Sequence, residues 1–567
     1  MKLLRLSAWT AWFMLCFVAT AAAEPISLIF AGIAGILKAG GIGAMLINAA
    51  FGIALKVGAS LLEKARAKRQ PQPGITGQLQ VGGNNSISFL VGDYATAGSL
   101  EYTGEWGNSG KTPNAYHVQV VTLSDLPQPG IGSRIWINGQ KCEIDFEATP
   151  VDQGYPVKEY RKGGNDHMWV KVLDGSQTEA DPYLLAKFGS HPEKPWKSDM
   201  IGRGATVVVL TALINRELLT QLPAGRYEPA GLPLYDPRMD DTAGGEGPQR
   251  WGVPSTYEPT ANPVVIIYNI LRGIWYEGEL LYGPAIPATR LPMANWIAAM
   301  NECDLPIEVE EDVFEPQYRC GYEIKVAEHQ PVDVILELLK GCDGKIAEIG
   351  GVYKIHVGPP ALPVAYIVDD DFMVTEEQEF EPFPGLENTF NGATASYPEP
   401  EAGWEMKDAP QRLFPEFEAE DDGRRLLADF QFNAAPHALQ VQRLMKSMVA
   451  DGRRFRKHRG TLGPWAFVLE PMDTISWTSV REGYDAKLFQ LDSMDDQVNA
   501  NQAVAFRETD PADFDWNFLT DGLPWSVGPI VPTWPTPQPV TGWQVLPAEL
   551  RDASGTGRRP SIEVRFD

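Results

Sequence analysis

The chain has 567 residues, and its 44% hydrophobic and 10% aromatic content excludes a globally disordered protein. This length predicts about three to five domains. The net charge of −26 excludes a protein that coats duplex nucleic acid, because such a protein needs a basic surface. A channel through which DNA slides without binding is compatible with that charge. The 54 glycines and 46 prolines favour short strands and long loops.

Residues 1–24 have the pattern of a secretory signal: Lys2 and Arg5, then an apolar core, then Ala-Ala-Ala-Glu. Whether this segment is cleaved stays open. Residues 25–70 form a second apolar segment, with a charge-free window at 39–55 that is at the lower limit for crossing a bilayer.

Small residues recur at every fourth position of the second apolar segment, from Ala31 to Gly43, which favours close helix packing. We expect a helical element buried inside an assembly; the alternative is a segment that enters a membrane. The residues expected to associate with a membrane or pore are Ile29, Phe30, Gly35, Gly43, Leu46, Phe51 and Leu55.

Residues 75–225 are predicted to form a β-rich domain, because the apolar pattern there has a period of two. Asn138-Gly139 separates two alternating runs and predicts a hairpin turn in which both residues take positive φ. Gly110-Lys111-Thr112 looks like the end of a phosphate-binding loop, but Glu105 stands where the first glycine is required. We therefore expect an ordinary hairpin turn there. Strands are predicted at 86–89, 116–120, 134–137, 140–146, 168–173 and 205–213.

Residues 226–305 are predicted to hold a glycine-rich loop followed by helices. The loop around Tyr235-Asp236-Pro237-Arg238 reads as an exposed turn. Asn262-Pro263 then starts a helix with one apolar stripe, made of Val264, Ile267, Tyr268 and Leu271. A second helix is predicted at 292–303.

Residues 306–405 predict an α+β unit with a helix at 334–339 and a hairpin that turns at Gly350-Gly351. Residues 406–523 predict a helix at 436–458 and closing strands at 465–469, 474–478 and 487–492. The end of that helix carries a basic cluster, Arg453, Arg454, Arg456 and Lys457. Intersubunit ion pairing, a solvated helix end and contact with passing DNA are the alternatives; we favour the first two.

No metal or cofactor site is predicted. Cys303, Cys320 and Cys342 are too widely spaced for a zinc or redox motif, and three buried thiols are favoured over one disulfide. The carboxylates at 369–371 and 376–381 lack the spacing of a calcium loop, so we expect a solvated acidic face. No nucleophile elbow or catalytic triad pattern appears, and we expect no enzymatic activity.

Residues 524–541 read as a Pro/Trp linker, and residues 542–567 as the first two strands of a fibronectin type III-like sandwich. The fold class predicted for the whole chain is mainly β with some α, in several domains.

Four phrases, in this order, carry a family resemblance: VGGNNSISFLVGDYATAGSLEY at 81–102, GKTPNAYHVQVV at 110–121, LEPMDTISWTS at 469–479 and ETDPADFDW at 508–516. Together with the 232–271 segment they resemble the central tail hub, or tip attachment protein, of long-tailed, lambda-like bacteriophages. The resemblance implies a structural virion protein whose hub domains form a trimeric ring. That ring would close the tail tube, carry receptor-binding fibres and open for genome ejection.

The implied partners are two further copies of the chain, the distal tail protein, other tail-tip proteins, the tape measure protein, the tail fibres and, during infection, the host membrane. DNA would be present only in transit. Residues 232–271 become the joint between hub domains, with Tyr235, Asp236, Arg238, Trp251 and Tyr268 as junction contacts. The alternatives are an exported or membrane-anchored bacterial surface binding protein and a polysaccharide-degrading tail enzyme.

Overall fold

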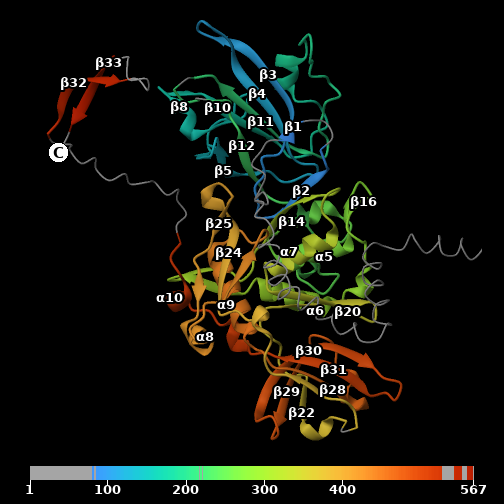
Figure 1. The fold of residues 1–567 in the computed structure, drawn as a ribbon. Helices are drawn as coiled ribbons and strands as arrows, with labels where there is room; N and C mark the ends of the chain where they lie inside the picture. The colour runs from blue at the N-terminus through green and yellow to red at the C-terminus, as the bar shows by residue number, and fades with distance from the viewer. Residues whose placement is uncertain are drawn as a thin grey trace, which may run out of the picture. The chain divides into compact units, whose positions relative to one another are not determined.

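The computed structural model describes residues 80–81, 85–215, 217–219, 221–373, 375–525, 542–551 and 558–565. The chain divides into two compact units, and the boundary lies between Ser526 and Val527. The apolar segments 1–24 and 25–70, their seven membrane or pore candidates, and most of the predicted linker lie outside the described residues. Within the described residues, no helix is long and apolar enough to cross a membrane. The mainly β fold with some α is confirmed (Figure 1).

The first large sheet has six strands, in the order β1-β3-β4-β11-β10-β7. Gly110 and Lys111 form the hairpin turn between β3 and β4, so the resemblance to a phosphate-binding loop has no structural basis. Residues of this sheet and of a second sheet, β12-β5-β6, enclose an apolar core. The strands are β1 (Gln80–Val81), β3 (Ser99–Ser109), β4 (Thr112–Ser124), β5 (Ile131–Ile137), β6 (Gln140–Glu143), β7 (Tyr155–Pro156), β10 (Met168–Leu173), β11 (Thr206–Leu213) and β12 (Gly225–Pro229).

The predicted Asn138-Gly139 turn is confirmed, with φ of 54° and 80°. It closes the β5–β6 hairpin, in which Ile137 pairs with Gln140. A short hairpin and one helix complete this part of the chain: β8 (Arg161–Lys162), β9 (Asn165–Asp166) and α4 (Pro182–Phe188).

Strand β2 (Ser88–Gly92) pairs with β19 (Gly321–Lys325), more than two hundred residues later in the chain. Gly92 has a φ of 65°, and a side chain there would collide with the carbonyl oxygen of Cys320. Glycine is therefore required at this crossing. The pairing places β2 on the same core as the helices that follow the joint.

Three helices, α5 (Pro263–Arg272), α6 (Met293–Cys303) and α7 (Pro331–Lys340), pack in the largest core. The sequence predicts one apolar stripe on α5, but the helix is buried from Pro263 to Leu271 on every side. Its neighbours are the hairpins β13 (Pro233–Leu234) with β14 (Glu258–Pro259), β15 (Ile274–Tyr276) with β16 (Glu279–Tyr282), β17 (Pro306–Glu310) with β18 (Val313–Pro316), and β20 (Gly344–Ile349) with β21 (Val352–Val357).

The long helix α9 (Ala438–Gly452) packs on a four-stranded sheet around β24 (Gly392–Glu399). It is shorter than the predicted 436–458, because Lys457 and His458 already belong to a strand. The other elements here are β25 (Glu405–Asp408), β26 (Arg412–Leu413), β27 (Leu427–Gln431), α8 (Pro415–Glu420) and α10 (Phe518–Asp521).

A second six-stranded sheet has the order β22-β29-β30-β31-β28-β23. The strand predicted at 465–469 is wrong: Pro464–Val468 form a 3₁₀ helix, which begins with a proline that has no amide hydrogen for a ladder. The strands are β22 (Ala365–Val368), β23 (Glu379–Glu381), β28 (Lys457–Leu462), β29 (Thr474–Ser479), β30 (Tyr484–Asp496) and β31 (Gln502–Glu508). In the second unit, β32 (Gln544–Arg551) and β33 (Arg558–Arg565) pair as an antiparallel hairpin.

Candidate functional site

The joint, residues 232–271, is tied to helix α5 through a buried asparagine. Asn262 caps the helix, accepting hydrogen bonds from the Val264 and Val265 amides at 3.0 and 3.2 Å. Asn269, one turn before the helix ends, accepts a bond from the Tyr235 amide at 3.1 Å and donates one to the Tyr235 carbonyl at 2.8 Å. The start of the glycine loop is therefore fixed to the centre of the largest core.

A buried carboxylate, Asp240, organises the next part of the loop. It accepts bonds from the Tyr235 hydroxyl at 2.7 Å, from the Thr242 amide and hydroxyl at 2.9 and 2.6 Å, and from Arg250 at 3.1 Å. Burial alone would raise the pKa of Asp240, but these hydrogen bonds and the Arg250 charge lower it below its ordinary value. Charged Asp240 is thus fully partnered inside the protein.

Arg238 joins the loop to helix α6. Its guanidinium contacts Asp236 at 2.7 Å and Asp304 at 2.7 Å, and it donates to the Asn301 side chain at 3.1 Å. Burial lowers the pKa of Arg238, but the two carboxylates outweigh it and raise the pKa above the ordinary value.

The aromatic junction residues also meet. The Tyr235 ring lies edge-on to Trp251, with 5.4 Å between ring centres, and the Arg272 guanidinium lies 4.1 Å from the centre of the Trp251 ring. Tyr268 lies edge-on to Trp296. The structure therefore brings the five predicted junction residues into one cluster.

The prediction of an exposed loop is wrong for the first residues of this segment and holds for the glycine-rich run 241–248, whose residues are exposed or half-buried. Tyr235, Asp236, Pro237 and Asp240 are buried, and the contacts described for them lie within the chain. The Gly/Pro composition was read as a solvent-exposed turn, whereas the loop folds back on its own polar network. The contacts described for these side chains hold the loop against its own backbone and helix α6.

The basic cluster after α9 is neutralised within the chain. Arg453 contacts Glu420 at 2.7 Å and Asp421 at 2.8 Å, and Arg454 contacts Asp513 at 2.6 Å. Arg456 lies 2.8 Å from Glu508. Lys457 lines a small cavity in the second six-stranded sheet. The three arginines therefore have intrachain acidic partners, which reduces the positive potential they offer to DNA.

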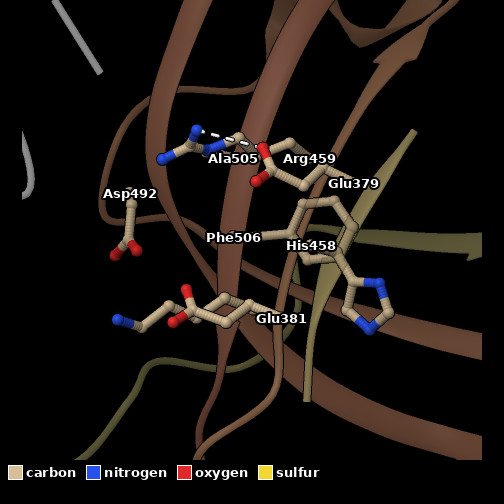
Figure 2. Close-up of a pocket in the computed structure, with 8 residues that line it drawn as sticks. Glu379, Glu381, His458, Arg459, Asp492, Ala505 and Phe506 are labelled. Carbon is tan, nitrogen blue, oxygen red and sulfur yellow. Dashed lines mark hydrogen bonds and ion pairs between the residues drawn. The ribbon is translucent and has the colours of Figure 1, made fainter. Parts of the chain in front are cut away.

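The cavity beside Lys457 is polar and narrow. Figure 2 shows Glu379 turned toward Arg459, with Glu381 of the same strand, β23, and Asp492 of β30 around the same space. Its volume of about 30 Å³ has room for a few water molecules.

His458 lines this cavity from the floor and belongs to an aromatic core. Its ring stacks on Phe380, with 4.4 Å between ring centres, and its Nε2 lies 3.0 Å from the Tyr484 hydroxyl. Burial and the charges of Arg456 and Arg481 lower the pKa of His458 to about 4. The imidazole is therefore neutral at pH 7.

The described cysteines are free thiols, and Cys303, Cys320 and Cys342 lie buried in the largest core. Burial raises the pKa of Cys303 and Cys320 well above the ordinary value, so both are protonated at pH 7. Among the described residues no group of histidines, cysteines and carboxylates is arranged to hold a metal ion.

A wider hollow of about 330 Å³ lies between β16 and the turn that precedes α7. The Tyr282 hydroxyl donates to the His329 carbonyl at 3.0 Å across it. It is an open depression, and the junction residues do not line it.

Two residues that organise the joint are absent from the contacts predicted from the sequence: Asn269 and Gln249. Gln249 accepts a bond from the Asp236 amide at 2.8 Å. Asn269 had a visible signal, because it is one polar residue inside an otherwise apolar helix. Gln249 had none, since its partner is thirteen residues away in an irregular loop.

No protein-family model and no curated protein matches the chain. Solved structures align with most of it. "Virion of native gene transfer agent (GTA) particle" aligns at 14% identity and a TM-score of 0.49, over 87% of this chain and 98% of that one.

The 43 kDa tail protein of prophage MuSo2 from Shewanella oneidensis aligns at 10% identity and a TM-score of 0.27, over 76% of this chain and 95% of that one. The tail protein from Neisseria meningitidis MC58 aligns at 10% identity and a TM-score of 0.24, over 75% of this chain and 96% of that one. All three TM-scores lie below 0.5, so these alignments establish neither a shared function nor a shared assembly.

Proposed function

We propose that this chain is a structural virion protein, the trimeric hub at the distal end of a phage tail. The hub closes the tail tube, carries receptor-binding fibres and opens for genome ejection. The observation that carries the proposal is the ordered set of hub-like phrases. They lie in β2 to β4 at one end and in β29 and the segment after β31 at the other, with the joint between them in the chain.

The joint supports a role in assembly. A hub transmits force between its domains, and a loop with buried, fully partnered Asp240 and Asn269 suits a rigid connection. A gate also needs contacts that differ between a closed and an open state. The anchoring residues of the joint, Tyr235, Asp236 and Asp240, are too deeply buried to supply them, so we assign movement to contacts that are exposed to water.

Exposed contacts of this kind connect the first β-rich part to the segment after β24. Arg134 lies 2.8 Å from Glu228 and 2.5 Å from Glu401, and Lys141 lies 2.6 Å from Glu401. The Trp404 indole donates to Glu228 at 2.6 Å. Partly exposed ion pairs exchange partners at low cost, because water replaces either member. We propose that these ion pairs are the contacts that differ between the closed and the open state.

Distal tail protein, tape measure protein and fibres are the partners of the proposed hub, and DNA passes through it only in transit.

Sedimentation of the full chain at rising concentration tests the trimer. A species of three 62.4 kDa chains is expected. A chain that stays monomeric at every concentration contradicts the hub and favours an exported surface-binding protein. Incubation of the same sample with envelope polysaccharide tests the enzyme alternative, and clear turnover would replace the structural role.

A further inference from the structure

The free edge of the second six-stranded sheet carries a row of exposed apolar side chains. Strand β22 is the terminal strand of that sheet, and within the described residues it pairs only with β29. Side chains alternate between the two faces of a strand. Ile367 is buried on the core side, whereas the alternate positions face water. The exposed fractions are 87% for Leu362, 58% for Val364, 77% for Tyr366 and 49% for Val368.

We call these four residues the β22 stripe. An exposed apolar edge strand invites pairing with another chain, and soluble proteins usually protect such edges with lysine, proline or a covering segment. Here the stripe has no lysine, and the prolines beside it, Pro359, Pro360 and Pro363, all lie before the paired residues of β22. A contiguous exposed apolar patch of this kind marks an interaction surface.

The charge around the stripe restricts the partner. Between Lys354 and Lys407 the sequence contains no Lys or Arg and eleven Asp or Glu. Asp369 and Asp370 follow the stripe directly, and Glu376 and Glu377 lie a few residues later. None of these four forms an ion pair with another residue in the described part of the chain.

We propose that β22 binds an extended, basic segment of a different protein by strand addition. The backbone of that segment would complete the ladder on the free edge, its apolar side chains would cover the stripe, and its Lys or Arg side chains would pair with the free carboxylates. A second copy of this chain is disfavoured, because it would bring the same uncompensated carboxylates to the contact. Neither the exposed stripe nor the charge around it depends on the tail-hub function.

Synthetic strand peptides test the proposal with the full chain. The basic probe is a peptide of about six alternating valines and threonines with lysines at one end; the acidic probe has glutamates instead. Fluorescence anisotropy should show the basic probe binding at least about tenfold more tightly, with a difference that shrinks as salt rises. A third probe, with prolines at alternate positions, should not bind, because it lacks the amide donors of a ladder.

Substitutions test whether the peptide binds at the β22 stripe. Tyr366→Glu should weaken the basic probe about tenfold or more, since it puts a charge where apolar surface is buried. Val480→Glu is the matched control: Val480 is 96% exposed in the same part of the chain, and its replacement should leave binding unchanged. Asp369→Asn with Asp370→Asn should bring the basic and acidic probes closer in affinity. Unfolding curves of the variants, measured alongside, should match that of the unmodified chain.

Three outcomes overturn the proposal: no binding of the basic probe, equal affinity for basic and acidic probes, or equal weakening by Tyr366→Glu and Val480→Glu. Self-association of the full chain that Tyr366→Glu abolishes would also overturn it, because a second copy would then occupy the stripe. If the chain fails to trimerise but binds the basic probe, the hub proposal is contradicted and the strand-addition proposal stands.

Discussion

Asn269 holds the backbone of Tyr235 from both sides, donating to its carbonyl at 2.8 Å and accepting from its amide at 3.1 Å. Both residues are about 3% exposed, so water does not replace either bond. A loop that looks flexible by composition is therefore fixed to a buried helix at its first residues. The rigidity of the joint depends on this contact.

Replacing Asn269 by Leu should lower the free energy of unfolding by about 2–4 kcal/mol, because it leaves a buried amide and a buried carbonyl without partners. Asn295→Leu is a matched control. Asn295 makes the same pair of bonds to the backbone of Ile355, at 2.8 and 2.9 Å, but it is only half-buried. Water reaches the Asn295 side of that contact, so a smaller loss of about 1–2 kcal/mol is expected. Urea denaturation measures both; equal losses would show that burial does not set the cost.

Asp240→Asn should destabilise the joint by about 1–2 kcal/mol at pH 7, because the neutral amide weakens the bonds from Tyr235, Thr242 and Arg250. The neighbouring Asp241→Asn should cost almost nothing, since the Asp241 side chain is 62% exposed. Limited proteolysis within residues 240–250 reports local opening. Equal protection of the two variants would contradict the role given to Asp240.

The pKa of His458 in the folded protein predicts that the second six-stranded sheet loses stability in acid. His458 has a pKa of about 4, below the ordinary value of about 6.5. The unfolded chain therefore binds more protons between these values. Stability contributed by neutral His458 is complete above about pH 6.5 and is lost as the pH falls to about 4.

The loss should reach at most about 2 kcal/mol, because solvent screens part of the effect. His458→Phe keeps a ring against Phe380 and should flatten the pH dependence of unfolding over this range. An unchanged slope in the variant would assign the acid sensitivity to other groups.

Arg134→Met should loosen the contact between the first β-rich part and the segment after β24. The substitution leaves the half-buried Glu228 carboxylate without the Arg134 guanidinium, which should lower the free energy of unfolding by about 1–2 kcal/mol. Hydrogen exchange of residues 399–405 should rise, and in the unmodified chain it should rise with salt. Arg161→Met removes an ion pair to Asp166 elsewhere in the first part and should leave residues 399–405 unchanged. A similar response in both variants would remove the special role of Arg134.

The sequence predicts local elements well where one periodicity dominates. Residues 168–173 alternate and form β10, and Asn138-Gly139 requires a turn and makes one. It fails where a distant partner decides the outcome. Pro464 starts a 3₁₀ helix instead of a strand, and the buried loop at Tyr235 depends on Asn269, thirty-four residues later. The pairing of β2 with β19 has no local signal either, except that Gly92 must be small.

Among the predicted site residues, the five of the joint form one cluster because the loop returns to α5 and α6. For the basic cluster, the sequence shows four cations within five residues but not the carboxylates at 420–421, 508 and 510–513 that fold against three of them. Charge clustering along a chain says little about net potential on a surface until the opposing charges are placed.

Electron cryomicroscopy of the particle that carries this chain tests the proposed function most directly. We predict three copies around one axis at the distal end of a tail tube, with the joint of each copy in the conformation described for residues 232–271. A particle whose tail end lacks the chain, or a single copy placed away from a threefold axis, would contradict the proposal.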